Sequence, residues 1–187
     1  ENNIAKQSVS EWDVGQKLKE LRSQSINYKG ESFGAIAGFK GNGALAHYRA
    51  KKESAKILGE GMFLLDSGGQ YVTGTTDITR TICIGEPTAN QKRHNTLVLK
   101  GMIALSKVKF VAGTTGNHLD ALARQFMWEE GLNYGHGTGH GVGFFLNVHE
   151  GPQGFGRAAN RSSAKQAIKA GMLLTNEPGL YFKEEYG

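Results

Sequence analysis

The spacing of apolar residues predicts an amphipathic helix over residues 10–25. Three apolar positions recur at steps of four and three, which places them on one helical face: Val14, Leu18 and Leu21. Ser10 can cap this helix, because Asp13 stands three positions later and completes a pattern like a capping box. The chain is therefore expected to open on a surface helix with one buried side.

The apolar pattern then becomes shorter and is broken by glycines. Residues 32–48 form short apolar pieces separated by glycine, which indicates short strands and loops. Residues 62–66 are a short apolar run that ends in an acid, and the glycine pair at 68–69 indicates a turn directly after it. This part of the chain is expected to build strands rather than helices.

Strict alternation over residues 78–84, isoleucine against threonine and cysteine, predicts another strand. We expect Asp66 and Asp77 to lie on neighbouring antiparallel strands, joined by a loop rich in glycine and threonine. Cys83 stands inside this apolar run, so a small buried side chain is a better interpretation than a nucleophile.

Two helices are expected next. The first follows Thr88, which forms a capping-box pair with Gln91. The second follows Asn117, which forms a similar pair with Asp120, and Gly131 suits its end.

The remaining elements are expected to be strand and turn at 137–148, loop or short helix at 164–169, and an apolar strand at 172–176. The order of helix, strands, two helices and strands predicts an α+β fold with a mostly antiparallel sheet, rather than a βαβ array.

Composition narrows the class of protein further. A length of 187 residues with 39% apolar and 21% charged residues is ordinary for one globular domain, or one domain and part of another. The longest uncharged apolar stretch, near residues 141–146, is far too short to cross a bilayer. The net charge of +5 is spread in small groups, which indicates solvated faces and no nucleic-acid surface. The single cysteine fits a reducing compartment, so we expect a cytoplasmic protein.

The first candidate site residues are the carboxylates of Asp66 and Asp77, eleven positions apart. A lone Asp at a strand end is usually a turn or cap residue. Two acids on paired strands would repel each other, and one would have to take up a proton. A bound divalent cation removes that conflict, so the pair is compatible with either a turn or a metal site.

Histidines form the second candidate group. His136, His140 and His149 fall within fourteen positions of a glycine-rich segment, whereas His94 and His118 are expected on helix surfaces. The Gly-Thr-Gly between the first two disfavours a regular helix there. A lone histidine is more often a hydrogen-bonded structural residue, but three in such a segment indicate a site.

Glu177 follows the last apolar run, and Pro178 restricts it to an extended conformation that aims its carboxylate from the strand end. A plain strand-to-turn junction would look the same. Together with His140 and the two Asp, it makes an oxygen-rich ligand set. Such a set favours Mn²⁺, with Zn²⁺, Co²⁺ or Fe²⁺ as alternatives, and its acids suit two ions sharing carboxylates.

Other motifs do not compete. Residues 137–143 fail the dinucleotide-binding pattern G-x-G-x-x-G because position 142 is Val, and neither a phosphate-binding loop nor a G-x-S-x-G motif is present.

Several motifs between residues 10 and 187 resemble one known family. They are Ser-Glu-Trp-Asp at 10–13, Asn-Gly-Ala-Leu-Ala-His-Tyr at 42–48, Leu-Asp-Ser-Gly-Gly-Gln-Tyr at 65–71, Gly-Thr-Thr-Asp-Ile-Thr-Arg-Thr at 74–81, His-Gly-Thr-Gly-His-Gly-Val-Gly at 136–143, Asn-Val-His-Glu-Gly-Pro at 147–152 and Asn-Glu-Pro-Gly at 176–179. The chain resembles the pita-bread metallopeptidases, and aminopeptidase P most closely. The motif at 147–152 is similar to the large cytosolic form of that family rather than to prolidase or methionine aminopeptidase.

The resemblance implies a pita-bread α+β fold, a curved and mostly antiparallel sheet flanked by helices. It implies that Asp66, Asp77, His140 and Glu177 are ligands of two divalent ions, with Asp77 bridging and Glu177 also the general base. It further implies that His47, His136 and His149 line the substrate site, with His136 and His149 taking part in catalysis. The implied reaction is hydrolysis of the N-terminal Xaa–Pro bond of peptides with proline second, by a metal-bridging hydroxide.

The family uses a fifth ligand, a Glu just beyond a Tyr-Gly pair like the one at 186–187. Residues 1–187 are therefore expected to be an incomplete catalytic domain, without N-terminal domains and final strands, that binds metal weakly and has little activity. The longer protein is compatible with a homodimer. Two alternatives stay open: a prolidase-type Xaa-Pro dipeptidase, and a non-catalytic interaction module on the same fold.

Overall fold

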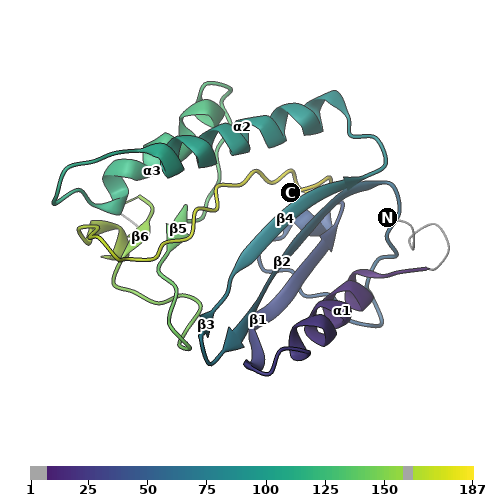
Figure 1. Ribbon diagram of the computed structural model, residues 1–187. Coiled ribbons are helices and arrows are strands. Elements are labelled where there is room, and N and C mark those ends of the chain that lie inside the picture. Colours follow the sequence, from purple (N-terminus) through teal and green to yellow (C-terminus); the bar gives the residue numbers. More distant parts are fainter. Residues whose placement is uncertain (1–7, 158–161) are drawn as a thin grey trace. The chain divides into compact units, whose positions relative to one another are not determined.

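The computed structural model describes residues 8–157 and 162–187. The chain divides into two compact units (Figure 1). The sheet unit contains the described residues up to Thr88 together with Tyr181–Gly187, and the helical unit contains Ala89–Leu180.

The sheet unit consists of one helix and an antiparallel sheet. Its elements are α1 (Glu11–Ser23), β1 (Tyr28–Phe39), the 3₁₀ turn η1 (Asn42–Ala44), β2 (Gly61–Tyr71), β3 (Gly74–Thr75) and β4 (Ile78–Ile84). The long strand β2 pairs antiparallel with β1, β3 and β4, and α1 packs against β1 (Figure 1). The predicted antiparallel sheet and the strand over 78–84 are confirmed.

The predicted cap of the first helix is confirmed. The backbone N–H of Asp13 donates to Ser10 Oγ at 3.2 Å, and the N–H of Ser10 donates to Asp13 Oδ2 at 2.9 Å. Val14 packs on the core, but Leu21 is 50% exposed, so its place on the buried face was predicted wrongly. In that last turn Arg22 reaches the sheet instead, donating from Nη2 to Ser67 Oγ at 3.0 Å.

Two strand predictions need correction. Residues 28–39 form one long strand rather than short pieces, because three register shifts against β2 absorb its irregularities. The glycine pair at 68–69 is not a turn, since β2 continues through it to Tyr71. A Cβ at position 68 would collide with the carbonyl oxygen of Thr76. Gly68 therefore allows the backbone of Thr76 to come close to β2 and does not reverse the chain.

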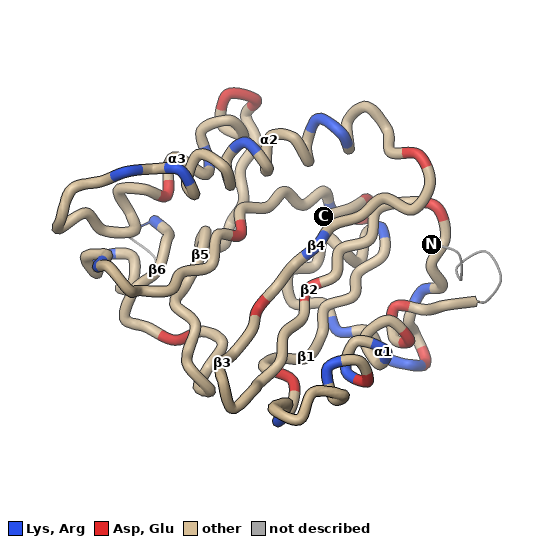
Figure 2. The backbone as a smooth tube through the Cα atoms, in the orientation of Figure 1, with Lys and Arg blue, Asp and Glu red and all other residues tan. Residues whose placement is uncertain are grey.

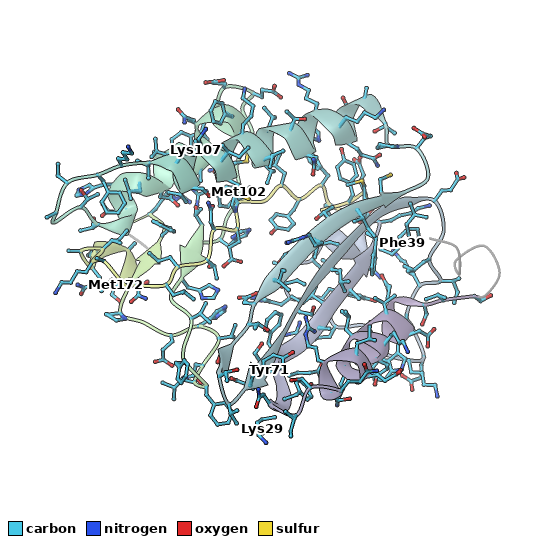
Figure 3. The ribbon with its side chains drawn as sticks, in the orientation of Figure 1. Lys29, Phe39, Tyr71, Met102, Lys107 and Met172 are labelled. Carbon is cyan, nitrogen blue, oxygen red and sulfur yellow. The ribbon has the colours of Figure 1, made fainter. Side chains whose placement is uncertain are left out.

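The sheet unit contains an apolar core and one buried carboxylate. Its buried apolar residues are Ala37, Phe39, Leu58 and Phe63, of which Phe39 is labelled in Figure 3. Glu11 is fully buried and accepts hydrogen bonds from the N–H groups of Phe39 at 2.7 Å and Lys56 at 2.9 Å. It also accepts from Asn42 Nδ2 at 2.9 Å and Tyr48 Oη at 2.8 Å. Burial, followed by the bond to Glu11, raises the pKa of Tyr48 to about 12.

The helical unit pairs two helices and adds short strands. Its elements are α2 (Ala89–Lys107), α3 (Gly116–Trp128), β5 (Gly139–His140), β6 (Gly154–Phe155) and the 3₁₀ turn η2 (Ser162–Lys165). The helices α2 and α3 lie side by side, and β5 pairs antiparallel with β6 (Figure 1). Buried Leu105, Leu119, Ala123 and Phe155 form its core.

The start of α3 was predicted two residues too late. Thr115 is the cap and His118 the third helical residue, because Asp120 is engaged elsewhere, in a buried ion pair with Arg124. The predicted end at Gly131 is confirmed, since it has a φ of 70° and its N–H donates to the carbonyl of Trp128.

The strand expected over 172–176 is wrong, because these residues belong to none of the strands. Backbone bonds still join this segment to the chain around β5, from Thr175 N–H to His140 O at 2.8 Å and from Glu177 N–H to Thr138 O at 2.9 Å. Acidic and basic residues intermingle along α1 (Figure 2). Within residues 8–157 and 162–187, no helix combines the length and apolar character needed to cross a membrane.

Candidate functional site

The acidic pair, Asp66 and Asp77, belongs to the sheet unit. Asp66 lies on β2 opposite Thr79 of β4, and Asp77 stands two residues before Thr79. Asp77 directly precedes Ile78, the first residue of β4, so the expectation that both acids lie on paired strands holds for Asp66 alone. Ser67, which Arg22 of α1 contacts, and Asp66 are neighbours on β2 and point to opposite faces of the sheet. Asp66 therefore faces away from α1.

Asp77 is held in place through the residue before it. The backbone N–H of Thr76 donates to the carbonyl of Gly69 at 2.9 Å, and the Gly69 N–H donates to Thr76 Oγ1 at 2.9 Å. Ser32 Oγ donates to the carbonyl of Thr76 at 2.7 Å. These three bonds pin the loop to β1 and β2, so the position of Asp77 is fixed even though it precedes β4.

This close approach requires glycine at position 68. A Cβ there would lie 2.0 Å from the carbonyl oxygen of Thr76, much closer than any real contact. We expect Gly68→Ala to push the Thr76 loop away from β2, because backbone rather than a flexible side chain blocks the methyl group. The expected cost is ~1–3 kcal/mol of stability, with weaker Mn²⁺ binding because Asp77 moves.

Gly59→Ala is the matched control, since a Cβ at position 59 meets nothing within 4 Å. Chemical denaturation and Mn²⁺ titration of both variants make the comparison. Equal stability of the two alanine variants would contradict the account of Gly68.

The histidine–glutamate cluster, consisting of His136, His140, His149 and Glu177, belongs to the helical unit. Nε2 of His140 lies 3.0 Å from Glu177 Oε1. Its Nδ1 lies 2.8 Å from the carbonyl oxygen of Gly141, and a carbonyl can only accept, so Nδ1 carries a proton. Nε2 is then the nitrogen directed at the carboxylate: in the imidazolium it donates to Glu177, and in the neutral ring it offers the lone pair that would bind a metal.

Glu177 is positioned by its neighbours in sequence. Thr175 Oγ1 donates to Glu177 Oε1 at 2.7 Å and accepts from the N–H of His140 at 2.9 Å. Asn176 Nδ2 donates to Ser106 Oγ and to the carbonyl of Met102, which is labelled on α2 in Figure 3. Gly139 permits the contact, since a Cβ there would lie 2.0 Å from the carbonyl of Thr175.

The electrostatics of the cluster keep Glu177 ionised. Burial raises its pKa, but hydrogen bonds from His140 and Thr175, aided by the charges of His140 and His136, outweigh burial. The net pKa of Glu177 therefore lies below its ordinary value. An ionised carboxylate beside an imidazole nitrogen is the donor combination that a divalent cation uses.

The other predicted histidines divide between the units. His149 is exposed, and its ring meets that of His140 edge-on with centroids 4.2 Å apart. His136 is half-buried against Tyr134 and, like His140, directs Nδ1 at the carbonyl of the next residue. His47 is exposed in the sheet unit, in the turn that follows η1. Three of the four thus lie in one unit with Glu177.

Thr175 and Thr138 were not predicted from the sequence. Thr175 stands two residues before Glu177 in an extended segment, so period-two spacing places both side chains on one face and could have found it. Thr138 lies between the two glycines that separate His136 from His140, and its buried hydroxyl donates to Asp120 on α3. Nothing local in the sequence indicates that contact.

The chain is similar to known metallopeptidases in sequence. Residues 2–187 match metallopeptidase family M24. A probable Xaa-Pro aminopeptidase P of Paracoccidioides brasiliensis is 47% identical over 180 residues, which cover 96% of this chain and 29% of that protein. The chain belongs to metallopeptidase family M24.

Solved structures agree with this assignment. An X-prolyl aminopeptidase from Caenorhabditis elegans, described as a cytosolic enzyme with a di-nuclear active site, matches with a TM-score of 0.91 and 41% identity over 98% of this chain and 29% of that one. The prolidase from Pyrococcus furiosus matches with a TM-score of 0.82 and 29% identity over 98% of this chain and 52% of that one. The predicted pita-bread α+β fold is confirmed. The chain spans 29% of the length of the Paracoccidioides relative.

Proposed function

We propose that this chain is the metal-binding part of an aminopeptidase that removes the N-terminal residue from peptides with proline in the second position. One observation carries the proposal: Nε2 of His140 and the carboxylate of Glu177 lie 3.0 Å apart in an M24 chain. Relatives named Xaa-Pro aminopeptidase P support the choice of substrate. The description of the Caenorhabditis elegans enzyme as cytosolic supports a cytoplasmic location.

We further propose that residues 1–187 belong to one catalytic domain, and that Asp66, Asp77, His140 and Glu177 would hold its metal ions. The di-nuclear site of the Caenorhabditis elegans enzyme supports two ions. Oxygen-rich donors favour Mn²⁺, with Zn²⁺, Co²⁺ or Fe²⁺ as alternatives. When bound, such ions lower the pKa of water and polarise the scissile carbonyl.

The chain's own residues would bind and orient the peptide and move protons. The pKa of Glu177 lies below its ordinary value, so its carboxylate is ionised at neutral pH, the form in which it would bind a metal and act as general base. His136 and His149, which accompany it in the helical unit, would donate hydrogen bonds to the scissile peptide and the oxygen that gains charge. His47 would contact the substrate from the sheet unit.

Substrate preference separates this proposal from its nearest alternative. The full-length protein with Mn²⁺ should cleave Xaa-Pro-Xaa peptides in preference to Xaa-Pro dipeptides and to peptides that begin with Met, whereas residues 1–187 alone should show little activity. Mass spectrometry of the three substrate sets measures the preference directly. Faster cleavage of Xaa-Pro dipeptides would replace the proposal with a prolidase-type activity.

A non-catalytic interaction module on the same fold is the rival from another class. The chain keeps all four candidate ligands, and Asp120, Thr138 and Thr175 hold their surroundings in place. A module selected only for binding has no need of them. Peptide binding that is unchanged by EDTA and by Mn²⁺ would favour the module.

A further inference from the structure

Helix α3 carries an ion pair that is almost completely buried. Arg124 is 1% exposed and Asp120 is 2% exposed, and Arg124 Nε donates to Asp120 Oδ2 at 2.6 Å. The two residues stand one helical turn apart. Neither belongs to the candidate ligands or to the residues proposed to face substrate.

The remaining donors of Arg124 reach the chain that leads to the histidine–glutamate cluster. Nη1 donates to the carbonyl of Tyr134 at 2.7 Å and to Asn133 Oδ1 at 2.9 Å. Nη2 donates to the carbonyl of His136 at 2.9 Å. The guanidinium also stacks on the Tyr134 ring, 3.7 Å from its centroid. The planar guanidinium group thus fixes three positions of the loop, at residues 133, 134 and 136.

Asp120 holds the next part of the same loop through Thr138. The hydroxyl of Thr138 donates to Asp120 Oδ1 and also contacts Tyr134 Oη, and Thr138 is completely buried. Burial raises the pKa of Tyr134 to about 12, so this phenol keeps its proton. The carbonyl of Thr138 in turn accepts the N–H of Glu177 at 2.9 Å. A continuous path therefore runs from the ion pair to the backbone of Glu177.

Stability alone is a poor explanation for this arrangement. A buried ion pair is costly to desolvate, and apolar residues of similar volume often serve a core equally well. The remaining hydrogen bonds of this pair go to residues 133–138, the segment shortly before His140. Hydrogen bonds that orient metal ligands commonly matter almost as much as the ligands themselves.

We infer that Arg124 and Asp120, acting through Thr138, are positioning residues that set the orientation of His136, His140 and Glu177 for metal binding. The inference rests on the proposed function, because that function makes His140 and Glu177 metal ligands and His136 a substrate contact. Arg124, Asp120 and Thr138 would themselves touch neither metal nor substrate.

Thr138→Val is the variant that tests the link, because it keeps the shape of the side chain and removes the hydroxyl donor. Charge removal at Arg124 or Asp120 would leave an unpaired buried charge and could unfold the protein. We expect Thr138→Val to weaken Mn²⁺ binding by ~10–100-fold in calorimetric titration. Thr138→Ser, which restores the hydroxyl, should recover most of the affinity.

Leu122→Ala controls for loss of stability, since this half-buried α3 residue packs on the core and takes no part in the hydrogen-bonded path. It should lower the melting temperature of the metal-free protein yet leave the Mn²⁺ affinity within about 2-fold of the parent, as expected for an independent site. The visible spectrum of bound Co²⁺ should change in Thr138→Val and stay unchanged in Leu122→Ala. Unchanged affinity and spectrum in Thr138→Val would overturn the inference.

Hydrogen exchange in the metal-free protein distinguishes this failure from failure of the proposed function. The N–H groups of Glu177 and Thr175 should exchange faster in Thr138→Val, with α2 unaffected. If the parent protein binds no Mn²⁺, the proposed function is wrong. Exchange at Glu177 and Thr175 that is the same in Thr138→Val as in the parent would show that Thr138 does not position Glu177. Faster exchange confined to these two residues would support positioning, whether or not Mn²⁺ binds.

Discussion

Replacing Asp77 by Asn is expected to weaken Mn²⁺ binding by more than the ~10–100-fold that loss of a residue behind the ligands costs. The amide keeps the shape of the side chain and its place beside Thr76, but it loses the charge that offsets a divalent cation. The fold should persist, because three bonds made by Ser32, Gly69 and Thr76 pin this loop to β1 and β2. Calorimetric titration gives the affinity, and thermal melting in EDTA gives the stability.

Glu53→Gln is the matched control, because it removes one exposed negative charge from the same unit. It should bind Mn²⁺ as the parent protein does. If Asp77→Asn retained the parent affinity, or lost it no more than Glu53→Gln does, Asp77 would not be a ligand.

The second large effect is expected on stability, from Glu11. Glu11→Ala would leave the N–H groups of Phe39 and Lys56 without their buried acceptor, at ~1–3 kcal/mol for each unsatisfied group. Asn42 and Tyr48 would lose their partner as well. We expect a loss of at least ~3 kcal/mol in the free energy of unfolding, measured by denaturation in urea or guanidinium.

An isosteric amide should not rescue this site. Both oxygens of Glu11 accept from donors, Oε1 from Phe39 N–H and Oε2 from Lys56 N–H, so the NH₂ of Glu11→Gln must face one of them. Glu20→Ala on the exposed side of α1 is the control and should change stability by no more than about 0.5 kcal/mol. Full stability of Glu11→Gln would show that the carboxylate is not required.

Local signals in the sequence predicted much of the fold. The Ser10–Asp13 cap and the alternation over 78–84 depend on residues close in sequence, and both are confirmed. Errors arose where a distant partner decided the outcome, as at Gly68, whose role depends on Thr76 across a hairpin.

In the candidate site, too, residues with a local sequence signal could be predicted, and residues that depend on distant partners could not. The types and settings of Asp66, Asp77, His140 and Glu177 could be read from the sequence, because metal ligands must be of few kinds. The residues that hold these four in place could not be predicted from the sequence. Asp120 looks like a helix cap until Arg124 and Thr138 are seen around it, and Glu11 meets partners 28 to 45 positions away.

Anomalous diffraction at the manganese edge, from crystals of this protein grown with Mn²⁺, tests the central claim most directly. The account predicts an anomalous peak for Mn²⁺ within bonding distance of His140 Nε2 and of the carboxylates of Asp66, Asp77 and Glu177. The anomalous peak of this ion should be lost in crystals of the Asp77→Asn variant. Peaks only at other residues, or no peak within bonding distance of these four at saturating Mn²⁺, would contradict it.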